Sequence, residues 1–230
     1  MLKVSRYVAE TRTEIEALRI WHGVGAALLL EADPDLGALL LERVLPGSVL
    51  AEVADDDQTV RAAAGLLRLL WQPVPASSQL RSLESWCDAY DRNRGSLGDG
   101  AAGCPRALFQ TADHLRAELI ASTVSPVMLH GDVHHFNILR SERAGWLAID
   151  PKGLVGDRCF DVCQFLRNPG PVPAGVNRRR LDIFADELGL ERARLSKWCL
   201  VHAVLDVCWD FEDGRSIQPA LAYAEQALSF

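Results

Sequence analysis

A polar segment and a single aspartate, each preceded by an apolar run, most strongly constrain what this chain of 230 residues can fold into. The first is His130–Asn137 (HGDVHHFN), which follows the apolar stretch Val127–Leu129. The second is Asp150, which closes the next apolar run (WLAI). Short apolar runs bounded by turn residues predict buried strands, so both segments lie where a strand ends. We therefore expect Asp132, Asn137 and Asp150 to converge on one point.

The residue types in these two segments suit the transfer of a phosphoryl group. An Asp with an Asn five positions on, and then an Asp at the end of a strand, has the spacing of a kinase catalytic loop and its magnesium ligand. In such a loop the first Asp accepts the proton of a substrate hydroxyl, and amide and carboxylate oxygens suit Mg²⁺. The spacing predicts Asp132 as the base and Asn137 with Asp150 as the metal ligands.

Composition and charge narrow the class of protein. The chain is 49% hydrophobic and 24% charged, which is typical of a globular protein. Its net charge of −7 disfavours a nucleic-acid partner and favours a cationic ligand. No apolar segment of a signal peptide follows Met1–Arg6, and no run is long enough to span a membrane. We expect a cytoplasmic protein, as a monomer or a weak dimer.

Hydrophobic periodicity predicts a small αβ part, 1–45, followed by a larger and mainly helical part, 46–230. The first part has a helix at 9–22 and three strands, which we place at 2–4, 26–30 and 37–43, and it ends at a hinge at Pro46-Gly47. The strands of the second part are Val127–Leu129 and a hairpin of 137–140 with 145–150. Its helices are expected at 57–71, 80–93, 105–122, 158–167, 176–188, 191–211 and 216–229.

The six cysteines show no C-x-x-C pairing, which indicates buried thiols in a reducing compartment. A zinc site at Cys199, His202 and Cys208 is the alternative, although these residues lack the usual paired spacing.

The two motifs, in this order and at this spacing, resemble those of the aminoglycoside phosphotransferases. The matching segments are Leu129–Leu139 (LHGDVHHFNIL) and Trp146–Asp157 (WLAIDPKGLVGD), and the likeness continues upstream through 39–47 and 15–25. Within that family the chain is most similar to the branch of streptomycin 6-kinases and hydroxyurea-resistance kinases. The resemblance implies an α+β, protein-kinase-like fold of two lobes, with a truncated N-lobe at 1–45 and a mainly helical C-lobe at 46–230.

The resemblance also implies that ATP and Mg²⁺ are used. Lys3 would neutralise the α- and β-phosphates, and Glu14 would hold it by an ion pair, with Glu16 as the alternative. In the resemblance the hinge is the segment Leu41–Pro46, which includes Glu42 and Arg43, and its backbone N–H and C=O groups would bind the adenine edge.

Other residues take supporting positions in the resemblance. His130 would stabilise the catalytic loop, and Asp161 would accept backbone N–H bonds from it. Lys152 would contact either phosphate or a structural partner. Asp157 and Arg158 would flank the substrate.

The implied activity is transfer of the γ-phosphoryl group of ATP to a hydroxyl of an aminoglycoside such as streptomycin, a cationic small molecule. Carboxylates bind guanidinium groups, and Asp206 and Asp210 lie four residues apart on one expected helix, close to Glu212 and Asp213. We expect them to line an acidic cleft; a solvated helix face is the alternative.

Two other functions remain open. In the family a glycine-bearing strand pair precedes the lysine strand, whereas here only Met1-Leu2 does, so weakened ATP binding and a catalytically impaired remnant form one alternative. The other is a metal-dependent phosphoesterase with His130, Asp132, His134 and His135 as ligands.

Overall fold

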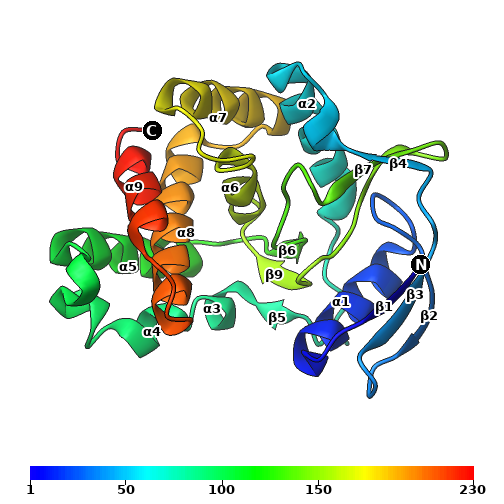
Figure 1. Ribbon diagram of the computed structural model, residues 1–230, viewed down its shortest axis with the longest axis horizontal. Coiled ribbons are helices and arrows are strands. Elements are labelled where there is room, and N and C mark those ends of the chain that lie inside the picture. Colours follow the sequence, from blue (N-terminus) through cyan, green and yellow to red (C-terminus); the bar gives the residue numbers. More distant parts are fainter.

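The computed structural model describes residues 1–230 and has small sheets at one end and long helices at the other (Figure 1). The chain begins with β1 (Leu2–Val4), α1 (Val8–Trp21), β2 (Leu29–Asp33) and β3 (Ala38–Leu41). The three strands form an antiparallel sheet in the order β1-β3-β2, in which Lys3 lies opposite Leu39. The apolar side of α1 is buried, as its periodicity predicted, and Trp21 donates its indole N–H to the Leu70 carbonyl.

Two further sheets hold the motif segments. Antiparallel strands β4 (Pro46–Val49), β7 (Ile138–Ser141) and β8 (Gly145–Ala148) form one, and the β7–β8 hairpin was predicted. The other contains β5 (Arg81–Ser82), β9 (Leu154–Gly156) and β6 (Val127–Leu129). Since β6 leads directly into the His130–Asn137 loop and β7 leads out of it, the two sheets fix both ends of that loop.

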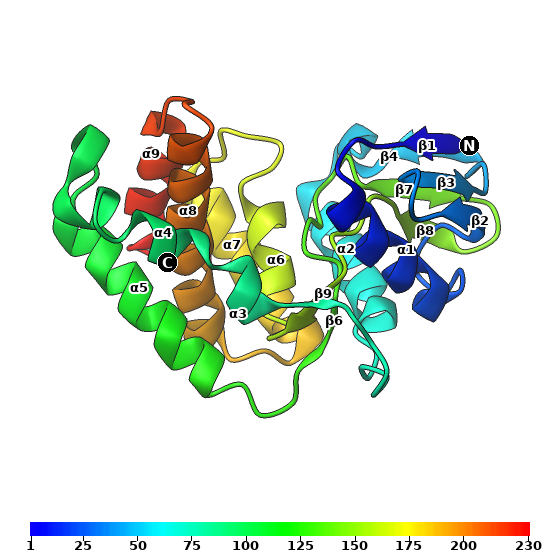
Figure 2. The same cartoon turned by 90° about the horizontal axis from the view of Figure 1, so that it is seen from below.

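The helical part is built around α8, which packs against α5, α6, α7 and α9 (Figure 2). The helices after α1 are α2 (Asp56–Leu70), α3 (Leu83–Trp86), α4 (Ala89–Asn93), α5 (Arg106–Ala121), α6 (Phe160–Leu166), α7 (Ala174–Leu188), α8 (Arg192–Glu212) and α9 (Gln218–Ala227). Asp55 caps α2 by accepting a hydrogen bond from the Gln58 N–H, which is the ordinary role of an N-cap carboxylate.

The structure corrects three details of the predicted elements. The strand expected at 26–30 begins only at Leu29, because Ala27 hydrogen-bonds across to Ala148 of the hairpin. The helix expected at 80–93 is divided into β5, α3 and α4, because Ser82 caps a new helix there. The strands β4, β5 and β9 were not predicted, because the Pro46-Gly47 pair at the start of β4 indicates a turn and the two or three residues of β5 and β9 carry no measurable periodicity.

One continuous apolar cluster runs from Ile15 in α1 to Ala227 in α9, so the sheets and the helices share a core. The division at residues 45 and 46 stays a prediction for that reason. All six cysteines are buried and unpaired. None of the helices combines the length and apolar character needed to cross a bilayer.

Candidate active site

The start of the His130–Asn137 loop is fixed by the buried carboxylate of Asp161 on α6. One carboxylate oxygen accepts the Gly131 N–H at 2.6 Å, and the other accepts the His130 N–H and the Trp71 indole N–H, each at 3.0 Å. Burial raises the pKa of Asp161 to about 6, while these three donors act in the opposite direction. Asp161 therefore fixes the start of the loop by accepting two of its backbone N–H groups, as the resemblance implied.

His130 ties the loop to the end of β8. Its side chain is fully buried, with Nδ1 accepting the Asp132 N–H at 3.2 Å and Nε2 lying 2.9 Å from the Ile149 carbonyl. Burial lowers the pKa of His130 to about 4, so the ring is neutral near pH 7. A neutral ring that accepts at Nδ1 must donate at Nε2, and this tautomer satisfies both contacts.

Asp132, Asn137 and Asp150 come together as the spacing predicted. The side-chain N–H of Asn137 donates to the Asp132 carbonyl at 3.0 Å, which leaves its Oδ1 free. The Ile149 N–H donates to the Asn137 carbonyl at 2.9 Å and so brings the next residue, Asp150, to the loop. The Asp150 side chain is 44% exposed and its backbone has a φ of 58°. An amide oxygen and a carboxylate on these two adjoining segments are donor types that fit Mg²⁺.

Lys3, in the first strand of the chain, reaches this place. Its ammonium lies 2.7 and 2.8 Å from the two carboxylate oxygens of Glu14 and 3.1 Å from Asp150. Burial raises the pKa of Glu14, and the contacts with the Lys3 ammonium act in the opposite direction. Because Lys3 contacts both carboxylate oxygens, we assign the charged form to both side chains. The alternative partner, Glu16, is engaged elsewhere, since it accepts the Gln79 N–H at 2.6 Å.

A cleft of about 390 Å³ opens beside the loop and is lined by Gly131, Asp132 and Lys152. The Lys152 ammonium lies 3.9 Å from the Asp132 carboxylate and 4.0 Å from Glu10. The backbone of Lys152 is held on both sides, because its N–H donates to the His130 carbonyl and its carbonyl accepts the Thr13 hydroxyl. The cleft is thus lined by one carboxylate of the motif, Asp132, and by the cation Lys152, whose backbone is held in place.

Glu42 and Arg43 lie between β3 and β4, away from that cleft. The Glu42 carboxylate accepts the Leu28 N–H at 2.7 Å and pairs with Arg143, which lowers the pKa of Glu42. The Glu42 N–H donates to the Leu28 carbonyl, so this residue is already engaged with its neighbours. The exposed Arg43 has no ion pair.

The two residues expected to flank the substrate, Asp157 and Arg158, are not part of the cleft. Asp157 is buried and accepts hydrogen bonds from the Trp198 indole and from Arg194. The Arg158 guanidinium lies 5.6 Å from the centre of the Trp71 ring. Both residues line a separate hollow next to α7 and α8, so the geometry assigns Asp157 to support of the fold.

The acidic lining expected from α8 is present only in part. Asp206 and Asp213 line the cleft, but Asp206 pairs with Arg167 and Asp213 with Arg215. Asp210 does not line it and pairs with Arg215 at 2.8 Å, while Glu212 is engaged by Arg92. The partners are arginines from distant segments or from the following turn, so helix periodicity alone could not reveal them.

The histidines of the motif do not form a metal centre. His135 is buried and stacks on Phe165 with ring centres 3.9 Å apart, whereas His130 faces the Ile149 carbonyl. No group of three or more His, Cys, Asp or Glu side chains converges anywhere in the chain. The donor arrangement therefore contradicts both the phosphoesterase and the zinc alternative.

Two solved phosphotransferases share this architecture. A choline kinase from Streptococcus pneumoniae superposes with a TM-score of 0.71 at 12% identity, covering 100% of this chain and 85% of that one. The AMP-bound spectinomycin phosphotransferase superposes with a TM-score of 0.61 at 16% identity, covering 98% and 82%. These similarities confirm the α+β, protein-kinase-like fold.

The sequence gives the family. Residues 1–214 match the aminoglycoside/hydroxyurea antibiotic resistance kinase family, and the chain belongs to it. It is 36% identical to streptomycin 6-kinase of Streptomyces glaucescens, over 99% of this chain and 76% of that protein. Hydroxyurea phosphotransferase of Kitasatospora aureofaciens is also 36% identical, over 95% and 65%. The predicted resemblance is confirmed, and the protein is a phosphotransferase enzyme.

Proposed function

We propose that this enzyme transfers the γ-phosphoryl group of ATP to a hydroxyl of an aminoglycoside such as streptomycin. The observation that carries the proposal is the meeting of the first strand with both motif segments: Lys3 contacts Asp150, Asn137 contacts the Asp132 carbonyl, and Asp132 lines the cleft. The relatives that are named streptomycin 6-kinases support the choice of acceptor.

The roles follow from the position of each group. Lys3, held by Glu14, contacts the α- and β-phosphates. Asn137 Oδ1 and the Asp150 carboxylate would hold Mg²⁺, which would supply positive charge to neutralise the phosphates. Asp132 orients the acceptor hydroxyl and takes its proton as the oxygen bonds to the γ-phosphorus and ADP leaves.

Lys152 has a place in the same proposal. Its ammonium lies near Asp132, at the side of the cleft where the transferred group would pass. A compact cation in that position donates hydrogen bonds to the phosphoryl oxygens as negative charge shifts during transfer.

The test is incubation of the purified protein with ATP, Mg²⁺ and streptomycin, followed by mass spectrometry of the antibiotic. The proposal predicts a product heavier than streptomycin by one phosphoryl group, formed only when both ATP and Mg²⁺ are present. Unchanged streptomycin in every condition would contradict it and would favour a remnant that binds ligands without turnover.

A further inference from the structure

One wall of the cleft holds several buried polar atoms that have no hydrogen-bond partner. They are Trp86 Nε1, Gln164 Oε1 and His202 Nδ1, from helices α3, α6 and α8. His202 Nδ1 lies 3.1 Å from Asp206, whose carboxylate is paired with Arg167. Buried polar atoms are almost always satisfied in folded proteins, so three of them beside the motif carboxylate indicate a surface that a ligand completes.

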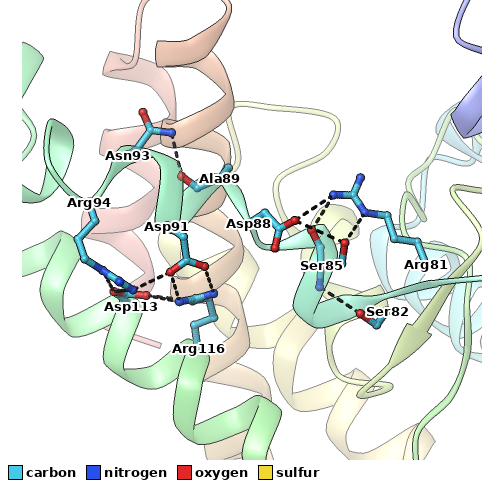
Figure 3. A network of polar contacts seen from close by, with 10 residues as sticks. All are labelled: Arg81, Ser82, Ser85, Asp88, Ala89, Asp91, Asn93, Arg94, Asp113 and Arg116. Carbon is cyan, nitrogen blue, oxygen red and sulfur yellow. Dashed lines mark hydrogen bonds and ion pairs between the residues drawn. The ribbon is translucent and has the colours of Figure 1, made fainter.

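The same wall has an aromatic surface held in place. The rings of Trp86 and Trp209 meet edge to face, with centres 5.4 Å apart. The Arg81 guanidinium lies 5.1 Å from the Trp86 ring, and Ser85 and Asp88 fix it there (Figure 3). The indole of Trp86 is therefore supported before any ligand arrives.

Ion pairs hold α4 and α5 together next to this wall. Arg116 of α5 pairs with Asp91 of α4 and with Asp113, and Arg94 joins the same two carboxylates (Figure 3). A cluster with two arginines and two carboxylates, one arginine nearly buried, holds α4 against α5. Because α4 directly follows α3, the position of Trp86 is fixed relative to the helical part.

The charges that line the cleft are balanced. Its cations are Arg81, Arg92, Lys152 and Arg215, and its carboxylates are Glu10, Asp132, Asp206 and Asp213. Two of those carboxylates already have arginine partners, as Asp206 pairs with Arg167 and Asp213 with Arg215. Burial lowers the pKa of His202 to about 3, so this ring is neutral. Recognition by this wall thus depends on hydrogen bonds and ring contacts more than on net charge.

We propose that Trp86, Gln164, His202 and Trp209 form the subsite for a hydroxylated ring of the acceptor. The C–H face of a saturated ring packs on the indoles, and its hydroxyl or amino groups supply partners to Gln164 Oε1, His202 Nδ1 and Trp86 Nε1. The claim that this ring belongs to the molecule that is phosphorylated rests on the proposed function. The claim that the ring binds at this subsite does not depend on that function.

The test is calorimetric titration of streptomycin without nucleotide into the wild type, Gln164→Leu and Trp86→Leu. Loss of one hydrogen-bond partner or of one stacking surface should weaken the Kd about three- to tenfold in each variant. Trp146→Leu is the matched control, because Arg140 lies 5.3 Å from its ring as Arg81 does at Trp86, yet Trp146 lies outside the cleft. Its Kd should stay within about twofold of the wild type.

An unchanged Kd in Gln164→Leu and Trp86→Leu would overturn the subsite, as would no binding by the wild type or equal weakening by Trp146→Leu. Thermal melting checks each variant, and Gln164→Leu decides if Trp86→Leu does not fold. A phosphoryl-transfer assay on the same proteins separates the two proposals. Selective loss of affinity without transfer by the wild type would contradict only the proposed function, and transfer with an unchanged Kd would contradict only the subsite.

Discussion

The ammonium of Lys3 lies 3.1 Å from the carboxylate of Asp150, although 147 positions of sequence separate them. This contact joins the first strand of the chain to the loop that follows β8, and Glu14 holds the ammonium from the other side. A cation between two carboxylates is charged and has a fixed direction. Lys3 is thus held beside the proposed metal ligand, where we propose that it contacts a phosphate group of ATP.

Replacement of Lys3 by Met should raise the KM for ATP about tenfold or more, because the proposed contact to the α- and β-phosphates is lost. The Kd for streptomycin without nucleotide should stay within about twofold, since Lys3 does not line the cleft. Steady-state kinetics and calorimetry give the two values. Lys197→Met is the matched control, because Lys197 pairs with Glu118 on the surface. Equal effects of the two substitutions on the KM for ATP would argue against this role for Lys3.

Asp161→Asn should lower kcat at least about tenfold while the KM for ATP changes less than about threefold. An asparagine offers one oxygen in place of two, so one loop N–H loses its acceptor and the loop carrying Asp132 shifts. Loss of a buried acceptor should also lower the free energy of unfolding by about 1–3 kcal/mol, measured by urea denaturation. Asp35→Asn, at an exposed turn, is the control and should change neither kcat nor the free energy of unfolding. A kcat equal to that of the wild type would rule out a positioning role.

Alanine substitution of Gly153, in the loop after Asp150, tests how tightly that loop is held, and Gly145, at the start of β8, is the control. Gly153 has a φ of +65° and an added Cβ would lie 2.4 Å from the Thr13 carbonyl oxygen, whereas Gly145 has a φ of +76° with open space around it. Gly145→Ala should therefore cost about 1–2 kcal/mol of unfolding free energy from backbone strain alone. Gly153→Ala should cost more and should also lower kcat, because Lys152 and Asp150 move with it. Equal destabilisation by both substitutions would show that the backbone accommodates the clash.

Much of the site could be predicted because its geometry is local in sequence. Asp132 and Asn137 share one loop, and Asp150 follows the hairpin that begins with that loop, so spacing alone brings them together. The ion pair of Lys3 with Glu14 was expected from the resemblance to kinases. The partners of the acidic residues on α8 were not predictable, because Arg167 and Arg92 arrive through tertiary packing.

The aromatic wall of the cleft was also missed. Trp86 is the last residue of α3, a helix of four residues that no periodicity indicates, and Gln164 resembles an ordinary polar residue on a helix. Their common feature, buried polar atoms without partners, exists only after α3, α6 and α8 pack together. Sequence patterns predict which residues face a core, but not which polar atoms remain unsatisfied there.

The stability of the protein should depend on pH through His202, which is buried next to Arg167 and Asp206. Burial and the charge of Arg167 lower the pKa of His202 to about 3, below its value in the unfolded chain. The unfolded state therefore binds more protons between about pH 6.5 and 3, and stability falls as the pH falls. Between pH 7 and 5 the loss from this group is about 2 kcal/mol.

His202→Phe removes the titrating group, so urea denaturation at pH 7 and 5 should show a smaller pH-dependent loss than in the wild type. A residual loss remains, because burial lowers the pKa of His130 and His135 as well. A pH dependence identical to that of the wild type would mean that His202 is not held neutral in the folded state.

We propose that Asp132 acts as the base in phosphoryl transfer from ATP to the acceptor hydroxyl. Transfer of label from γ-³²P-ATP to streptomycin, compared between the wild type and Asp132→Asn, tests this role. We predict transfer by the wild type and a fall of at least about a hundredfold in kcat for Asp132→Asn, because an amide cannot take the proton. The affinity for ATP, measured by calorimetry, should be retained. A variant that transfers label at a rate within about threefold of the wild type would contradict the claim.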